Sequence, residues 1–190
     1  MIYLASQSPR RRELLSQIGV QFQTIHADID ETPLQNEAPI DYVIRMAREK
    51  ALTAAVKHQD KPLLAADTTV VCNNNILGKP QDQQHFRKMM DCLSGNTHQV
   101  ITAIAVIQGS ARDSLVTATS ASTVRFRELT VSEIETYWQA GEPADKAGGY
   151  AIQGLAAAFI SEIQGSYSGI MGLPLFETAE LLKKFAVDVI

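Results

Sequence analysis

The stretch that decides the fold is LLAADTTVVC, residues Leu63–Cys72 of a chain of 190 residues. It is a continuous apolar run rich in β-branched side chains, which predicts a buried central strand. The three asparagines that follow it, residues 73–75, predict a hairpin turn. One side chain breaks the pattern, because Asp67 places a carboxylate in the middle of the run, where an ionised group is costly without a partner.

Helical and extended segments alternate on either side of this strand. Extended runs predict further strands over residues 2–5, 20–26, 98–107, 114–126 and 155–163. Apolar periodicity and helix-ending residues predict helices over residues 9–18, 40–58, 81–93, 131–140 and 175–185. Interleaved elements with two long antiparallel runs in the middle predict an α/β fold, in which a mixed, partly antiparallel sheet is flanked by helices.

Length and composition fit a single domain over residues 1–190, with 45% hydrophobic and 20% charged residues. The formal net charge of −4 and the scattered basic residues argue against nucleic acid and membrane surfaces as partners. We expect no secretory signal and no membrane-spanning run, and the cytoplasm fits best. Cys72 and Cys92 lack metal-site spacing, and we expect two buried thiols.

The segment SQSPRRR, residues 6–12, predicts a phosphate-binding helix start. Ser8 supplies a hydroxyl cap, and Pro9 fits the first helical position. Three arginines in the first turn are unfavourable there, because the helix N-terminus is already positive. A bound phosphate would resolve this conflict, whereas the alternative is a solvated basic turn. The segment lacks the glycines and the Gly-Lys-Ser/Thr ending of a P-loop.

An acidic loop and the interrupting aspartate supply candidate metal ligands. Asp28, Asp30 and Glu31 form either a solvated turn or a group of carboxylates around a hard cation such as Mg²⁺. For Asp67, either the strand ends there and the side chain faces a cleft, or the side chain caps the next turn. A carboxylate at this position is suited to activating a water molecule or to binding a metal ion.

Two lysines and a glycine-rich segment complete the candidate set. Lys50 falls on the apolar stripe of a predicted helix, so its side chain either extends to the rim or points into a site. Lys79 lies in a rigid Gly-Lys-Pro turn. In DKAGGYAIQG, residues 145–154, the paired glycines permit close backbone approach to a ligand, and Gln153 carries both a donor and an acceptor, as reading a nucleobase edge requires. The alternative is an ordinary glycine-rich loop.

Taken together, these segments resemble the Maf family. The matching motifs keep their order along nearly the whole chain: ASQSPRR (5–11), DIDE (28–31), REKA (48–51), ADT (66–68), GKP (78–80), SG and TH (94–95 and 97–98), DKAG (145–148), YAIQG (150–154) and GLP (172–174). Each motif alone is weak, but their joint occurrence is highly specific.

The resemblance implies a fold with two lobes around a cleft, related to the inosine triphosphate pyrophosphatases. It also implies a homodimer and a Mg²⁺- or Mn²⁺-dependent hydrolysis of a nucleoside triphosphate between its α- and β-phosphates. Asp67 matches the family's catalytic proton acceptor, with a role chiefly as metal ligand as the alternative, and Glu31 matches a metal-associated glutamate. The positions that match the phosphate end of the site are Ser8, Arg10, Arg11, Lys50 and Lys79, and both lysines are expected to act in catalysis.

The family divides by substrate. One branch, which prefers dTTP and UTP and includes modified uridine nucleotides among its substrates, carries arginine, threonine and glutamine at three selectivity positions. Here these residues are Arg10, Thr68 and Gln153, which match that branch. The alternatives are the branch that prefers 7-methyl-GTP, and a nucleotide-binding regulator with little turnover, because the family is also linked to restraint of septum formation at cell division.

Overall fold

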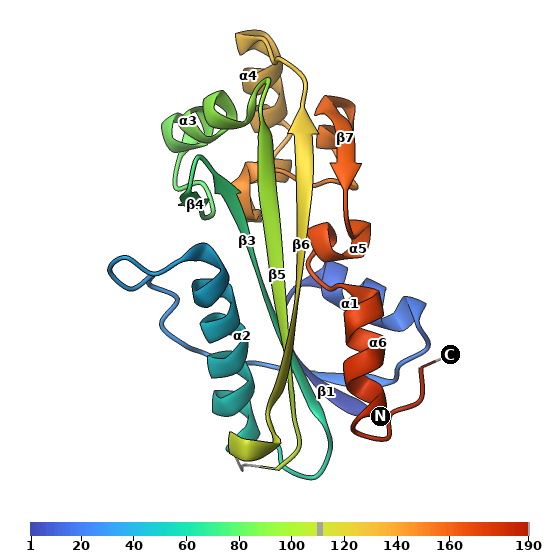
Figure 1. The fold of residues 1–190 in the computed structure, drawn as a ribbon. Helices are drawn as coiled ribbons and strands as arrows, with labels where there is room; N and C mark the ends of the chain where they lie inside the picture. The colour runs from blue at the N-terminus through green and yellow to red at the C-terminus, as the bar shows by residue number, and fades with distance from the viewer. Residues whose placement is uncertain (110–111, 190) are drawn as a thin grey trace.

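The computed structural model describes residues 1–109 and 112–189, and its centre is a seven-stranded sheet in the order β2-β1-β3-β5-β6-β7, with β4 paired to β3 outside this path (Figure 1). β1 is parallel to β2 and β3, whereas the other pairs are antiparallel, so the predicted mixed sheet is confirmed. The strands are β1 (Ile2–Ala5), β2 (Phe22–Ile25), β3 (Leu63–Cys72), β4 (Asn75–Leu77), β5 (Thr97–Ile107), β6 (Val116–Phe126) and β7 (Ile160–Gln164). The helices are α1 (Pro9–Gln17), α2 (Pro39–Ala55), α3 (Gln83–Leu93), α4 (Val131–Gln139), α5 (Tyr167–Met171) and α6 (Leu175–Lys183).

The long strands carry different helices at their two ends (Figure 1). At one end α2 covers one face of the sheet, and α1 with α6 covers the other. At the opposite end α3 and α4 pack in a separate apolar cluster. The side-chain alternation of β3 connects these layers, because Leu63 faces the α2 cluster, Leu64 faces the α1 and α6 cluster, and Val70 enters the α3 and α4 cluster.

The edge of β3 is open where the helical layers separate. β1 pairs with β3 only as far as Ala65, and β4 begins to pair at Val70. Within the described ranges, residues 66–69 therefore have no strand on that side, while β5 pairs along the other edge. Asp67 and Thr68 are the two half-buried positions of an otherwise buried strand. The strand thus continues through Asp67, which neither ends it nor caps a turn, but the side chain does face a cavity, as one of the two alternatives expected.

The turn after β3 is the predicted hairpin. Asn73 and Asn74 have φ values of 50° and 63°, a left-handed conformation that asparagine tolerates, and Cys72 pairs directly with Asn75. A two-residue loop of this kind turns the chain back along β3. It therefore directs the following Gly-Lys-Pro segment toward the open edge.

The expectation of two buried thiols is wrong, because Cys72 and Cys92 are joined in a disulfide with their Cα atoms 6.6 Å apart. Cys72 is the last residue of β3, and Cys92 lies in the last turn of α3. Their sequence separation of 20 residues gives no indication of contact. The packing of α3 beside the end of β3 brings the two Cβ atoms within bridging range.

The structure corrects one predicted strand and adds a helix. Residues 155–163 were expected to be extended, but Leu155–Phe159 form a 3₁₀ helix, and only the segment that follows is β7. A short apolar run does not distinguish a strand from a buried helical turn, which explains the error. The five-residue helix α5 is too short to show a periodic pattern. Within the described part of the chain, no helix has both the length and the apolar character needed to cross a membrane.

His98 is a buried titratable group at the start of β5, where it is 2% exposed. Its Nε2 atom lies 2.7 Å from the Tyr150 hydroxyl, and burial lowers the pKa of the imidazole to about 4. The unfolded chain titrates near its ordinary value of 6.5, so between these two values the unfolded state binds the additional proton. The contribution of His98 to stability is therefore complete above the unfolded pKa and is lost as the pH falls toward the folded one.

We expect the free energy of unfolding of the wild type to fall by about 2 kcal/mol more than that of His98→Gln between about pH 7 and about pH 5. Glutamine keeps a polar partner for Tyr150 but does not titrate. Urea unfolding of both proteins at the two pH values measures this difference. Because the other titratable groups are common to both proteins, their contribution cancels in the comparison. Parallel losses in the two proteins would show that His98 is not the acid-sensitive group.

Candidate active site

One cavity of about 680 Å³ opens beside the unpaired edge of β3, and its size suits a nucleotide-sized ligand. The nine site residues predicted from the sequence all line it: Ser8, Arg10, Arg11, Glu31, Lys50, Asp67, Thr68, Lys79 and Gln153. They come from the start of α1, the loop after β2, α2, β3, the turn after β4 and the segment before the 3₁₀ helix at Leu155. The open edge of β3 explains how side chains from so many elements reach one space.

The centre of the cavity is a lysine held between two carboxylates. Lys50 Nζ lies 2.7 Å from Asp67 Oδ1 and 2.6 Å from Glu31 Oε1. The Lys50 and Asp67 side chains are each 13% exposed, whereas that of Glu31 is 54% exposed. Lys50 thus points into the site, and its neighbours on the helical stripe, Val43 and Ala47, are fully buried. The geometry resolves the sequence-based alternative in favour of a lysine in the site.

The electrostatics of Glu31 follow from this arrangement. Burial on its own raises the pKa of the carboxyl, but the hydrogen bond from Lys50 and the charges of Lys50 and Lys79 outweigh burial and lower it below 4.5. Asp28 and Asp30 do not line the cavity, and Asp30 Oδ1 instead accepts a hydrogen bond from the Thr32 amide at 2.9 Å. The interpretation of three loop carboxylates around one cation is therefore wrong, and only Glu31 reaches the site.

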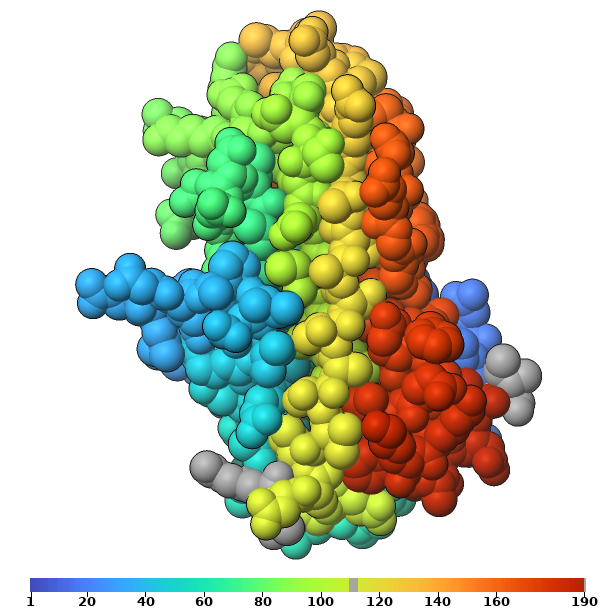
Figure 2. All heavy atoms as spheres, viewed as in Figure 1, coloured from blue at the N-terminus to red at the C-terminus, as the bar shows by residue number. Residues whose placement is uncertain are grey.

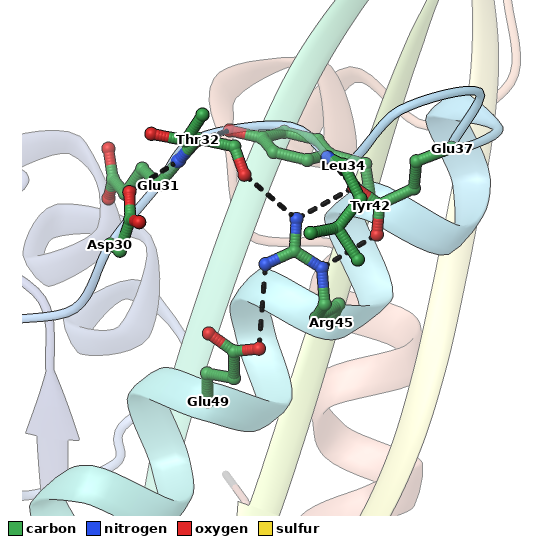
Figure 3. Close-up of polar contacts among 8 residues, drawn as sticks. All are labelled: Asp30, Glu31, Thr32, Leu34, Glu37, Tyr42, Arg45 and Glu49. Atoms are coloured by element: carbon green, nitrogen blue, oxygen red, sulfur yellow. Dashed lines mark hydrogen bonds and ion pairs between the residues drawn. The ribbon is translucent and has the colours of Figure 1, made fainter.

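The β2–α2 loop, residues 26–38, projects from the side of the molecule and is fastened to α2 by Arg45 (Figures 2 and 3). Arg45 Nε and Nη2 donate to the two Glu37 oxygens at 2.6 and 2.7 Å, and Nη2 also donates to the Thr32 carbonyl at 3.1 Å. The Tyr42 hydroxyl donates to the Glu31 carbonyl at 3.0 Å. These contacts hold both sides of the loop against one helix, and so fix the backbone that carries Glu31.

Arg45→Met is expected to loosen this loop without unfolding the protein. The substitution keeps the apolar stem of the side chain but removes the bidentate contact and the bond to Thr32. Amide hydrogen exchange at Leu34, whose N–H donates to Glu37 at 3.0 Å, should become about tenfold faster or more. Arg48→Met, at an exposed position of the same helix, is the matched control. Equal exchange in both variants would contradict the assignment of Arg45 as the fastening residue.

The three arginines at the start of α1 have different environments. Arg11 bonds within the protein, with Nε donating to the Gly172 carbonyl at 2.7 Å and Nη2 to Thr68 Oγ1 at 3.0 Å, and burial lowers its pKa. Arg10 lines the cavity without a hydrogen-bonding partner among the described residues, and Arg12 is exposed outside it. Ser8 is at the N-cap, but its side chain makes no cap bond, in contrast to the expectation. Arg10 is thus the arginine best placed to meet an anion at this helix start.

Residues 145–153 form another part of the cavity lining, to which Asp145, Lys146 and Gln153 contribute. In contrast to the expectation of close approach to a ligand, Gly148 and Gly149 do not line the cavity but pack against the protein core. A Cβ at Gly148 would lie 2.9 Å from Val70 Cγ2, and one at Gly149 would lie 2.9 Å from Phe86 Cδ2. Both have positive φ, at 69° and 70°, so they let the chain turn tightly against the α3 and α4 cluster.

Sequence reasoning missed two residues of the site. Tyr42 lines the cavity and bonds the Glu31 backbone, and its position eight residues before Lys50, about two turns on the same helix face, was the available signal. Ser6 Oγ accepts from the Ser8 amide at 3.2 Å and from Arg11 Nη1 at 3.3 Å, so it shapes the helix start from outside the helix. Its position inside the predicted phosphate motif was the only indication.

The fold and the cavity define a mixed α/β protein with paired carboxylates and cationic side chains in a cleft at a helix start. The chain belongs to the Maf family, because the sequence model of that family, described as Maf-like protein, matches residues 1–185. A dTTP/UTP pyrophosphatase of Pseudoalteromonas translucida is 50% identical over 185 residues, which cover 97% of this chain and 96% of the relative. A dTTP/UTP pyrophosphatase of Alkalilimnicola ehrlichii is 49% identical over 193 residues, which cover 98% and 94%.

A solved structure of a HAM1 protein from Coxiella burnetii has the same fold. It superposes with a TM-score of 0.54 over 96% of this chain and 98% of that chain, at 16% sequence identity. At this identity the likeness concerns the fold alone. The α/β class with a helix-flanked mixed sheet is thereby confirmed a second time.

Proposed function

We propose that this protein is a nucleoside triphosphate pyrophosphatase that hydrolyses dTTP and UTP, and modified uridine triphosphates, to the monophosphate and pyrophosphate. The observation that carries the proposal is the Lys50 ammonium held between Asp67 and Glu31 inside a cavity that also contains Arg10 and Lys79. Relatives at about half identity over nearly their whole length bear the name dTTP/UTP pyrophosphatase, which supports the choice of substrate.

A divalent metal ion, Mg²⁺ or Mn²⁺, fits the donor set. Glu31 and Asp67 each place one oxygen within 2.7 Å of the Lys50 ammonium, so the two carboxylates lie close together at one side of the cavity. The described residues contain no group of three or more acidic, histidine or cysteine side chains able to hold a metal on their own. Two carboxylates with substrate phosphates completing the shell are typical of magnesium in nucleotide enzymes. When bound, such an ion neutralises phosphate charge as it develops in the reaction.

The roles of the chain's own residues follow from their positions. Arg10 and Lys79, which have no hydrogen-bonding or ion-pair partner among the described residues, are available to hold the triphosphate at the N-terminus of α1. Asp67 accepts a proton from the water molecule that attacks the α-phosphorus. The bond between this phosphorus and the bridging oxygen breaks, and pyrophosphate leaves with that oxygen and its electron pair. Positioning and charge neutralisation supply most of the rate enhancement in such reactions.

Base selection is assigned to Gln153. Gln153 is exposed to the cavity, and its amide has no partner among the described residues, so both its donor and its acceptor remain available. A thymine or uracil edge presents a carbonyl oxygen next to an N–H group, which an amide matches in one orientation. Thr68 Oγ1 accepts a hydrogen bond from Arg11 and lies 2.9 Å from Thr102 Oγ1. Its contribution is therefore to fix the position of the Arg11 side chain beside the cavity.

The test is pyrophosphate release from a panel of nucleoside triphosphates with Mg²⁺ or Mn²⁺. Preferential turnover of dTTP and UTP is the expected result. Turnover of 7-methyl-GTP alone would move the protein to the other branch of the family. No turnover of any triphosphate, with binding retained, would favour a nucleotide-binding regulator and overturn the proposal.

A further inference from the structure

The segment that carries Gln153 is held at both ends by one pair of side chains. The Tyr137 hydroxyl, on α4, accepts a hydrogen bond from the Ala151 amide at 3.3 Å and donates to Glu142 Oε1 at 2.7 Å. The other oxygen of Glu142 accepts from the Leu155 amide at 3.0 Å. One chain of hydrogen bonds therefore runs from residue 151 through Tyr137 and Glu142 to residue 155, and Gln153 lies midway between its ends.

Tyr137 and Glu142 are themselves held in place by tight packing. Tyr137 is 3% exposed, and its ring contacts those of Phe86 and Phe159 with centroids 6.0 and 5.3 Å apart. The backbone at Gly154 lies so close to Glu142 that a Cβ at this position would overlap the carboxylate. The segment therefore lies directly against the Glu142 carboxylate, and a side chain at position 154 would have to displace that carboxylate.

Base discrimination by glutamine needs such support. The amide can rotate to exchange its donor and acceptor, so the side chain alone matches either a thymine or an adenine edge. Discrimination therefore depends on the distance between the amide and the bound phosphates, because a purine is larger than a pyrimidine. Gln153 has no hydrogen bond of its own among the described residues, so its backbone sets this distance.

We propose that Tyr137 and Glu142 are positioning residues for substrate selection, which hold the segment from Ala151 to Leu155 so that Gln153 accepts a pyrimidine and excludes a purine. The inference rests on the proposed function, since it concerns the choice among triphosphates. Neither side chain lines the cavity, so both act through the backbone of the segment between them.

The test is Tyr137→Phe, which removes the hydroxyl but keeps the ring and its packing. The ratio of kcat/KM for dTTP to that for dATP is expected to fall about tenfold, since such a site rejects a misfitting base by a few kcal/mol at most. Tyr3→Phe is the matched control, because it removes a hydroxyl bonded to Asp60 at 2.9 Å, outside the cavity. Thermal unfolding of both variants verifies that they are folded.

Gly154→Ala disturbs the same contact from the other side and is expected to lower the ratio similarly. In the double variant that combines Tyr137→Phe with Gly154→Ala, the two losses in this ratio should be less than additive, because either substitution alone already releases the segment. Glu142→Gln keeps polar atoms facing Tyr137 and the Leu155 amide, whereas Glu142→Ala removes them. The ratio of kcat/KM for dTTP to that for dATP should therefore stay higher in Glu142→Gln than in Glu142→Ala.

The outcomes separate the inference from the function. A wild type that cleaves neither dTTP nor UTP overturns the proposed function, and the positioning role with it. If the wild type is active but Tyr137→Phe lowers kcat/KM for dTTP and dATP equally, the proposed function stands and the positioning role is overturned. A selective rise in relative purine turnover, absent from Tyr3→Phe, supports the positioning role.

Discussion

Asp67→Asn is expected to release pyrophosphate from dTTP and UTP about a thousandfold more slowly than the wild type, because the amide cannot accept the proton of the attacking water. The substitution preserves size, and the amide oxygen can still accept a hydrogen bond from Lys50, so the fold should be kept. Measurement of kcat with a coupled pyrophosphate assay and of the thermal unfolding midpoint tests both parts.

The control is Asp60→Asn, at a carboxylate that accepts from the Tyr3 hydroxyl outside the cavity, and it should leave turnover unchanged. A titration with Mn²⁺ separates the two roles considered for Asp67. If Asp67 acts chiefly as a metal ligand, high metal concentration restores much of the activity of Asp67→Asn; if it accepts the proton, the loss persists. Wild-type turnover in Asp67→Asn would exclude both roles.

Lys50→Met is expected to lower kcat/KM for dTTP about a hundredfold and to move the acid limb of the pH profile to higher pH. Burial raises the pKa of Glu31, and the hydrogen bond and charge of Lys50 are the main causes that lower it, so removal of Lys50 lets the pKa rise. A raised pKa means that Glu31 is protonated, and lost as an anion, at a higher pH than in the wild type. The pH dependence of kcat/KM, recorded below neutrality, measures this shift.

Lys57→Met serves as the comparison, because Lys57 is exposed just beyond the end of the same helix and does not line the cavity. It should reproduce the wild-type rate and the wild-type acid limb. A Lys50→Met enzyme whose rate falls while its acid limb stays in place would restrict Lys50 to binding phosphate. An unchanged rate would exclude Lys50 from the mechanism.

Local patterns predicted most of the fold. The apolar run 63–72 became β3 with the predicted ends, and the two asparagines after it form the expected turn. Both signals are short-range, because they depend on side-chain alternation and on the backbone freedom of neighbouring residues. The same reasoning failed over residues 155–163, where a turn and a strand share one apolar run.

The sequence by itself pointed to the charged groups at the centre of the site, because each is anomalous in its local setting. Asp67 interrupts an apolar strand, Lys50 interrupts an apolar helix stripe, and the arginines crowd a positive helix end. Only the tertiary structure decided what these groups contact. Lys50 meets Asp67 across 17 residues of sequence, Arg11 meets the Gly172 carbonyl across 161, and Tyr137 reaches Ala151 across 14. Such partners are brought together by the open edge of β3 and by the packing of α4 against the segment that carries Gln153, and no local pattern encodes distances of that kind.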